Sequence, residues 1–158
     1  DSYMNSSACD PVDAIMSVMN AAFDPAFGEA WTRRQVSDAL IMANTHYFLA
    51  DLAGEAPANP ADTVGFLLSR HGADEEELLL LAVVPEARRR GVAGQLIKRF
   101  AKEAAERGVA RLFLQMREGN EAEILYRAQG FLPIGRRREY YRGPHGHRID
   151  AITFGRDL

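Results

Sequence analysis

The spacing of apolar residues switches several times between the helical and the extended pattern, and each switch marks an element. Asp10 followed by proline is a typical helix start, and the apolar residues behind it predict a helix from residue 11 to about residue 22. Thr32 and Gln35 form a capping box, which predicts a second helix directly after it. The most regular helical stripe covers residues 93–105 and predicts the strongest helix of the chain.

Extended patterns predict strands around these helices. They cover residues 45–52, 63–70, 77–84, 111–116, about 131–139 and 148–154. The third is an almost unbroken apolar run, so we expect it to be buried on both faces at the centre of a sheet. A short helix capped by Asn120, with Glu123 at its third position, is predicted before the last two strands. This order of helices and strands indicates an α/β (α+β) domain.

Length and composition describe an ordinary folded domain. The 158 residues suit a single domain spanning residues 1–158, in which residues 1–8 suggest a processed terminus and receive no function. Hydrophobic residues make up 47% of the chain and charged residues 26%, which is typical of a soluble globular protein. The net charge of −3 argues against a general polyanion binder, so nucleic-acid binding would need a local basic patch.

The cysteines, apolar runs and histidines of the sequence argue against several further classes of protein. Cys9 is the only cysteine, which excludes an internal disulfide and a cysteine-based metal site and favours a cytoplasmic protein. The longest apolar run, residues 78–84, is far too short to span a bilayer, and no apolar leader opens the chain. The histidines lack metal-ligand companions in the sequence, and His145-Gly146-His147 is typical of a turn. We therefore expect no metal and no membrane partner.

The sharpest local feature is the basic, glycine-containing segment 88–94 between the central strand and the strongest helix. Three consecutive arginines at a helix N-terminus are unfavourably placed, because the helix dipole there favours negative charge by roughly 0.3–1 kcal/mol. Glycines in the segment allow close approach of the backbone, and the first helical N–H groups can bind an anion. The segment predicts a phosphate or pyrophosphate site, although a solvated basic turn is the plain alternative. It matches neither the P-loop nor the G-x-G-x-x-G pattern.

The segment resembles the Q/R-x-x-G-x-G/A signature of the GNAT acyltransferases, with Arg88, Gly91 and Ala93 at its defined positions. Further motifs follow in the family's order from about Trp31 to the end of the chain, and they are most similar to RimI-type protein N-terminal acetyltransferases. These motifs are Ala30-Trp31-Thr32, Leu81-Ala82-Val83, Leu125-Tyr126 before Gly130-Phe131, Tyr140-Tyr141 and Asp150-Ala151-Ile152. The resemblance implies a single GNAT-fold domain with a mixed, mostly antiparallel central sheet flanked by helices.

The resemblance also implies an activity and a site. The expected reaction transfers acetyl from acetyl-CoA, a co-substrate, to an amine, and the favoured acceptor is a protein N-terminus, of which a ribosomal protein is one example. Tyr126 would protonate the departing CoA thiolate, a reasonable role for a phenol of pKa about 10, although a core aromatic is the plain alternative. The expected cofactor-binding residues are Leu81, Ala82, Val83, Arg88, Arg89, Arg90, Gly91, Val92, Ala93, Gly94, Asn120 and Tyr126. Trp31, Tyr140 and Tyr141 would line the peptide side, although each could be a packing residue.

Two positions depart from the family pattern. Asn120 and Tyr126 are six residues apart where the family has seven, which turns one relative to the other by about 100° on a helix. Gln115 stands where RimI-type enzymes carry a glutamate base, and an amide cannot accept the amine's proton. Glu77 could relay that proton through water, or it could be one of several solvated acidic residues.

An N-terminal amine tolerates a missing base better than a lysine does. At pH 7 roughly 14% of an α-amine with pKa near 7.8 is neutral, against about 0.04% of a lysine with pKa 10.4. General-base catalysis contributes about 10²- to 10⁴-fold, so substantial activity could survive without it. The alternatives that stay open are a GNAT enzyme acting on a small-molecule or lysine amine, and a catalytically silent acyl-CoA-binding module.

Charge is distributed unevenly along the chain. Residues 88–111 hold eight basic and two acidic side chains, whereas residues 51–77 hold seven acidic and one basic. The basic segment would attract CoA, and the acidic one a cationic amine. An RNA-binding domain that uses Arg136 to Arg138 is disfavoured, because no aromatic residues interleave with the basic ones in an RNP pattern.

Overall fold

The computed structural model describes residues 10–23 and 29–158, so residues 1–8 and Cys9 lie outside the described part. The helices are α2 (Pro11–Ala22), α3 (Arg33–Leu40), α4 (Val92–Glu106) and α5 (Glu123–Ala128). The strands are β1 (Thr45–Ala50), β2 (Gly65–Gly72), β3 (Glu75–Val83), β4 (Arg111–Arg117), β5 (Leu132–Arg142) and β6 (Arg148–Asp157). The predicted elements are all present, in the predicted order.

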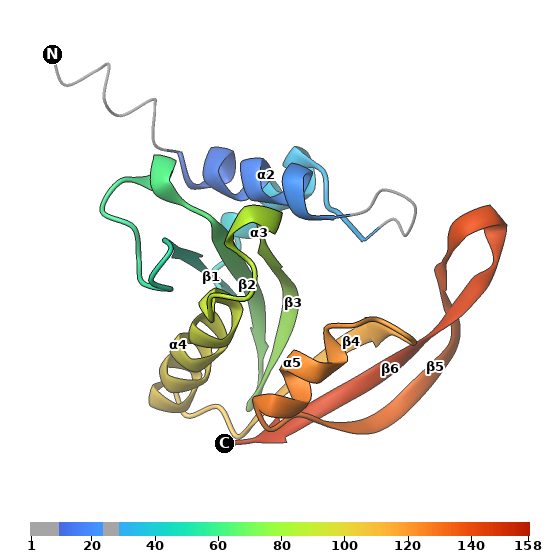
Figure 1. The fold of residues 1–158 in the computed structure, drawn as a ribbon. Coiled ribbons are helices and arrows are strands. Elements are labelled where there is room, and N and C mark those ends of the chain that lie inside the picture. The colour runs from blue at the N-terminus through green and yellow to red at the C-terminus, as the bar shows by residue number, and fades with distance from the viewer. Residues whose placement is uncertain (1–9, 24–28) are drawn as a thin grey trace, which may run out of the picture.

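The strands form one six-stranded sheet with the order β1-β2-β3-β4-β6-β5. All neighbouring strands are antiparallel except β3 and β4, which pair in parallel. The prediction of a mixed, mostly antiparallel sheet is therefore confirmed. A parallel pair requires a crossover, and α4 supplies it between β3 and β4 (Figure 1).

Helices cover both faces of the sheet and enclose two apolar cores. On one face, α2 and α3 pack against β2 and β3, with Ile15, Met19, Phe66 and Leu68 fully buried. On the other face, α4 and α5 close a larger core that includes Phe100. Figure 1 shows α2 and α4 on opposite sides of β1–β3. The sheet is thus the middle layer of three.

Local sequence signals explain where the helices begin and end. The Asp10 carboxylate accepts a hydrogen bond from the Val12 N–H, and the predicted capping box of Thr32 and Gln35 is present in both directions. The prediction for α5 is wrong in one detail. Its N-cap is Ala122, because the Asn120 side chain accepts from the Ala122 N–H and forms a turn before the helix starts.

The two central strands separate along their length, which positions the cavity described below. Pairing of β3 with β4 runs from Glu75 opposite Arg111 to Leu78 opposite Leu114 and then ends. At the same place the register of β3 against β2 shifts, and Leu79 is left without a partner on β2. We call residues 75–78 and 111–114 the closed end of the strand pair, and residues 79–83 and 115–117 the open end.

The burial pattern along β3 differs from the expectation. The strand lies third of six, as predicted, but buried and half-buried residues alternate along it instead of being buried on both faces. The half-buried positions Glu77, Leu79 and Leu81 line a cavity. An apolar run therefore marks this strand as central, and around the irregularity at Leu79 residues from both of its faces line the cavity.

Candidate active site

A cavity of about 920 Å³ lies at the open end of the β3–β4 pair. Its wall consists of residues 77–83 of β3, 114–117 of β4, 120–122, 125 and 126 around α5, 140 and 141 of β5, 22, 23, 29–31 and 35 of the α2–α3 region, and Arg70, Arg88, Arg89 and Ala93. Because β4 no longer pairs with β3 there, one backbone edge of residues 79–83 is free of strand pairing and can bind a ligand. The strand geometry thus provides hydrogen-bonding groups inside a cavity.

The N-terminus of α4 fits an anion at one end of this cavity. Gly91 is the N-cap, has φ of 81°, and provides no side-chain hydrogen bond to the first turn, which also lacks an acidic residue. The first N–H groups of a helix have no partner within the helix, so those of residues 92–94 can bind phosphate oxygens. Arg89 lines the cavity, and Arg90 is exposed beside it in the sequence. These groups fit the diphosphate of a nucleotide cofactor.

Arg88 is held by the protein itself. Its Nε donates to the Val83 carbonyl at 3.2 Å, and its Nη2 donates to the Ala22 carbonyl at 3.0 Å. The side chain therefore joins the end of β3 to the end of α2 beneath the segment 88–94. These two bonds use two of the five N–H donors of the guanidinium. Arg88 therefore helps to shape the cavity, and its remaining donors could still bind an anion.

Tyr126 is a buried phenol on the cavity wall. It is 8% exposed and its ring packs edge-on against Phe131, with ring centroids 5.9 Å apart. Burial, and to a smaller degree the nearby Glu29 and Tyr141, raises the pKa of Tyr126 well above its ordinary value near 10. The phenol is consequently protonated throughout the neutral range and can act as a proton donor.

Gln115 places an amide side chain on the cavity wall. Its Oε1 accepts a hydrogen bond of 2.7 Å from the Thr153 hydroxyl on the neighbouring strand β6. An amide is not a base in either orientation. A proton acceptor is therefore not available at this position.

Three carboxylates lie on the cavity wall, of which Glu121 is exposed and Glu29 and Glu77 are partly buried. Glu77 on β3 is 21% exposed and forms an ion pair of 3.4 Å with Arg70. Glu29 is 19% exposed and accepts a hydrogen bond of 3.2 Å from Arg117 Nε. Glu77 is thus a partly buried residue of the cavity and not simply one of the solvated acidic residues of the β2–β3 turn.

Aromatic side chains flank the carboxylates. Tyr140 and Tyr141 are packed edge-on at 5.0 Å between ring centroids, and both line the cavity with Trp31. Burial, followed by the nearby carboxylate of Glu29, raises the pKa of Tyr141 to about 12. Trp31 also packs against the core on the α2 face, so this residue both lines the cavity and packs against the core.

The cavity brings together most of the residues predicted from the sequence. The residues on its wall are Trp31, Glu77, Leu81, Ala82, Val83, Arg88, Arg89, Ala93, Asn120, Tyr126, Tyr140 and Tyr141. Arg90, Gly91, Val92 and Gly94 belong to the adjoining turn and helix start, where Val92 is a buried core residue. Glu29, Arg70 and Arg117 were not predicted from the sequence as site residues. They come together only in the folded chain, where Arg117 pairs with Glu29 and Arg70 pairs with Glu77.

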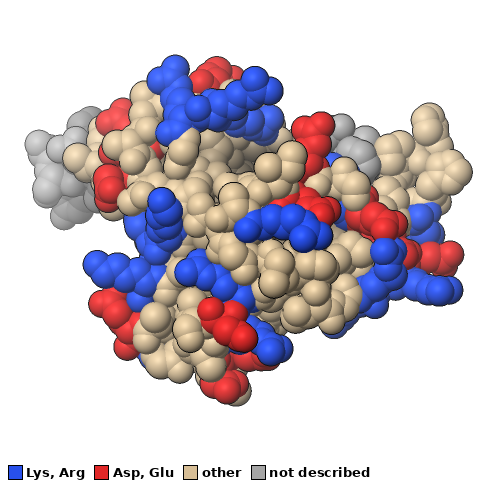
Figure 2. Space-filling view, turned by 60° about the horizontal axis from the view of Figure 1, so that its bottom comes forward, with Lys and Arg blue, Asp and Glu red and all other residues tan. Residues whose placement is uncertain are grey.

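The surface around the site is basic in part. Figure 2 shows groups of Lys and Arg side chains bordering an uncharged, hollowed stretch of one face. Such a distribution favours association with an anionic ligand even though the net charge of the chain is −3. Among the described residues, no helix is long and apolar enough to cross a membrane.

Sequence comparison assigns the chain to a family. Residues 43–133 match the acetyltransferase (GNAT) domain family, and the chain belongs to it. The predicted GNAT fold is confirmed.

Among its relatives are ribosomal protein bS18-alanine N-acetyltransferases. The protein of this name from Haemophilus influenzae is 33% identical over 90 residues, which are 57% of this chain and 62% of the relative. That from Escherichia coli strain K12 is 39% identical over 88 residues, which are 55% of this chain and 59% of the relative. The matched segment thus spans about three-fifths of these relatives.

The structural comparison extends over more of the chain. The crystal structure of the ribosomal-protein-S18-alanine N-acetyltransferase from Escherichia coli superposes with a TM-score of 0.78 at 28% identity, covering 93% of this chain and 87% of that one. The likeness therefore includes the C-terminal strands that lie beyond the family match.

Proposed function

We propose that this chain is an acetyl-CoA-dependent N-acetyltransferase that acetylates a protein N-terminal α-amine. The observation that carries the proposal is the open end of the β3–β4 pair, where a free strand edge, an uncapped helix start and a buried phenol face one cavity. The names of the relatives favour the N-terminal alanine of ribosomal protein bS18 as the acceptor. Such an acceptor belongs to the cytoplasm, the location expected from the sequence.

Two groups of residues would bind two different parts of acetyl-CoA. The N–H groups of residues 92–94, together with Arg89 and Arg90, would bind the pyrophosphate. The free edge of residues 81–83 would bind the pantetheine amides and the acetyl carbonyl, and one of its N–H groups would stabilise the developing oxyanion. The Asn120 side-chain oxygen already accepts the Ala122 N–H, so its contribution to CoA would come from its amide NH2.

The transfer requires one proton to leave the amine and one to reach the sulfur. The neutral amine nitrogen attacks the acetyl carbon, the carbon–sulfur bond breaks, and the thiolate takes the proton of the Tyr126 hydroxyl. Burial raises the pKa of Tyr126, so the hydroxyl is protonated at neutral pH when the amine attacks. Because the phenol is a core residue, its position is fixed by packing before the substrate binds.

Proton removal from the amine is the step for which this site differs from the RimI-type pattern. The Gln115 amide cannot accept a proton, so we propose that the amine enters largely as the neutral form and that Glu77 accepts its proton through water. Trp31, Tyr140 and Tyr141 would hold the peptide beside it. Lysine acceptors are disfavoured, since their neutral fraction at pH 7 is some 300 times smaller.

Mass spectrometry of matched peptides tests the proposal. One peptide carries a free N-terminal alanine and no lysine, and a second has a blocked N-terminus and one lysine; each is incubated with the chain and acetyl-CoA at pH 7.5. We expect acetylation of the first only. Acetylation of the second, or of neither despite saturable acetyl-CoA binding, would refute the proposed acceptor class.

A second candidate function is supported by Gln115. If the amide marks loss of catalysis, the domain is a silent acyl-CoA-binding module that retains the α4 site and the strand edge. The absence of acetylation of either peptide even at pH 9, with acetyl-CoA binding intact, is the result that this alternative predicts.

A further inference from the structure

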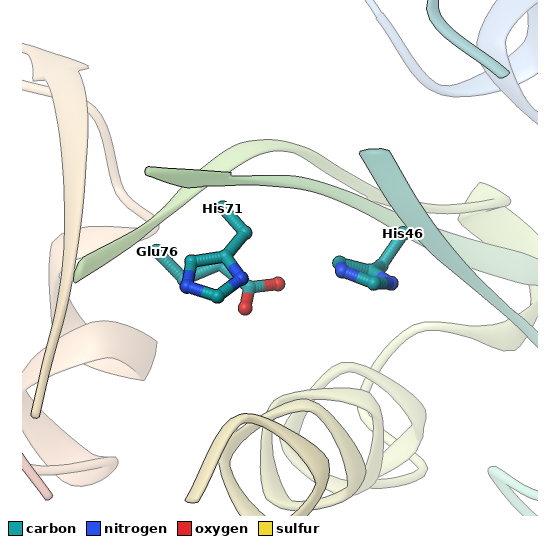
Figure 3. Close-up of side chains that lie close together, drawn as sticks. All are labelled: His46, His71 and Glu76. Atoms are coloured by element: carbon teal, nitrogen blue, oxygen red, sulfur yellow. The ribbon is translucent and has the colours of Figure 1, made fainter. Parts of the chain in front are cut away.

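Two histidines and a glutamate that are far from one another in the sequence converge at the closed end of the sheet. His46 lies on β1, His71 on β2 and Glu76 on β3, and their ligand atoms all lie within 4.8 Å of one another. The expectation that the histidines lack companions is therefore wrong for His46 and His71. Figure 3 shows the two imidazole rings on either side of the Glu76 carboxylate.

The strand register explains the convergence. His71 pairs directly with Glu76, and His46 pairs with Ser69, two residues before His71 on the same face of β2. Diagonal neighbours of this kind are within reach of long side chains. Because the three strands belong to one rigid sheet, the positions of the donors are set by the fold and not by a flexible loop.

We propose that His46, His71 and Glu76 form a binding site for a divalent late first-row metal ion such as Zn²⁺. Two imidazoles and one carboxylate are a ligand set typical of zinc, with a fourth position left for water. The site is separate from the acyltransfer cavity, because none of the three residues lines that cavity. Glu76 and Glu77 are adjacent on β3 but face opposite sides of the sheet, so only Glu77 reaches the cavity.

The surroundings orient the ligands as in known metal sites. His71 Nε2 lies 2.7 Å from the Ala73 carbonyl oxygen, which can only accept, so Nε2 carries the hydrogen and Nδ1 keeps its lone pair for a metal. A second hydrogen bond of this kind is common for metal-binding histidines. The Ala73 carbonyl is held in place by a tight turn in which that residue has φ of 53°.

The carboxylate is fixed as well. Glu76 is fully buried, and its Oε2 accepts a hydrogen bond of 2.5 Å from the Ser69 hydroxyl. Its Oε1 accepts from Arg107 at the end of α4. Carboxylates that bind metals are regularly held by such outer hydrogen bonds, which keep one lone pair of each oxygen available.

Arg107 competes with the metal and provides the sharpest test. Its guanidinium neutralises Glu76 in the metal-free protein, but its Nη1 also lies 3.6 Å from the more exposed Glu103 carboxylate. A bound cation would repel the guanidinium toward Glu103. Removal of the Arg107 charge should therefore tighten metal binding, whereas a purely structural cluster predicts no binding in either form.

The experiment is a calorimetric titration of the chelator-treated chain with Zn²⁺ at pH 7.5. We expect one ion per chain and a rise in Tm on binding. His46→Gln and His71→Gln should each weaken the Kd at least about 10-fold, and Arg107→Gln should tighten it at least about 10-fold. The matched control replaces the two histidines of the β5–β6 hairpin, His145→Gln and His147→Gln together, and should bind as the parent does. Circular dichroism checks that each variant is folded.

Several results would overturn the site. One is the absence of saturable binding by the parent, even if Arg107→Gln binds. A second is binding that survives both His46→Gln and His71→Gln, and a third is binding that is lost with the hairpin histidines, which would place the ion there. If Arg107→Gln fails to fold, the parent, the two single histidine variants and the hairpin control still decide the question.

Discussion

The closed and open ends of the β3–β4 pair consist of the same two strands but use their residues differently. At the closed end, residues 75–78 and 111–114 are paired, and Leu78, Leu112 and Leu114 are buried in the core beneath α4. At the open end, residues 79–83 and 115–117 separate, and half-buried side chains face a cavity. Strand pairing and core packing are thus concentrated at the closed end. At the open end the backbone N–H and C=O groups lack strand partners, and a bound ligand can form hydrogen bonds with them.

The difference shows how a sheet can contain a binding edge without having an exposed edge strand there. Both strands remain in the middle of the sheet, since β2 pairs with β3 and β6 pairs with β4 along the open end. Those outer pairs hold the separated backbones in place. Substitutions at the open end should therefore affect activity first, and substitutions at the closed end should affect the free energy of unfolding first.

The largest expected effect on activity comes from Tyr126→Phe at the open end. Loss of the hydroxyl removes the proton donor to the thiolate, and kcat should fall about 10²- to 10⁴-fold, with little change in the Kd for acetyl-CoA. Steady-state kinetics and calorimetry measure the two quantities. Tyr47→Phe, on an exposed residue that does not line the cavity, is the control. Full kcat in a folded Tyr126→Phe variant would make the tyrosine a packing residue only.

Leu112→Ala tests the closed end. Leu112 is fully buried, and its truncation should lower the free energy of unfolding by about 2–5 kcal/mol, measured by urea denaturation. Leu81→Ala, on the half-buried cavity wall, should lose less than half as much. Equal losses from both variants would contradict the proposed division between the two ends.

Gly91→Val separates backbone strain from ligand binding. Gly91 and Gly108, at the two ends of α4, have φ of 81° and 84°, and a Cβ at either position would meet nothing within 4 Å. Valine should therefore impose a similar strain of about 1–2 kcal/mol at both. Only at Gly91 should it weaken the Kd for acetyl-CoA, by about 10-fold or more, because that backbone is proposed to lie against the pyrophosphate. Equal Kd values for the two variants would place the anion elsewhere.

Gln115→Glu has the smallest effect, and it depends on pH. In the parent, kcat/KM should rise with pH up to the α-amine pKa near 7.8 and then level off, because the neutral amine is the reactant. A carboxylate at this position should raise kcat/KM by about 10-fold at pH 6 and by less than about 2-fold above pH 8. Gln115→Met, which cannot accept a proton, is the control. A parent profile that is flat from pH 6 to pH 8 would show that the chain already has an efficient base.

Helices and motifs could be predicted from sequence because their signals are local. The caps at Asp10 and Thr32 and the alignment of segment 88–94 with the start of α4 depend on residues a few positions apart. The prediction for Asn120 was incorrect by two positions, because an asparagine can cap a turn that precedes a helix as well as the helix itself.

Contacts between distant segments were beyond prediction from the sequence. Arg88 bonds a carbonyl 66 residues away, and Gln115 bonds a hydroxyl 38 residues away. The convergence of His46, His71 and Glu76 likewise depends on the register of three strands. A single sequence contains the residue types of such clusters but not their distances, so the segment proposed to bind an anion could be predicted and the cluster of His46, His71 and Glu76 could not.

The most direct test of the account is to measure amide hydrogen exchange by NMR, once with and once without acetyl-CoA. We predict that acetyl-CoA slows exchange at the open end, in residues 79–83, and at the start of α4, in residues 92–94, while residues 75–78 of the closed end are already protected and change little. Tyr126→Phe should leave this protection intact. Protection that appears elsewhere, or at both ends of the strand pair alike, would contradict the assignment of the open end as the acetyl-CoA site.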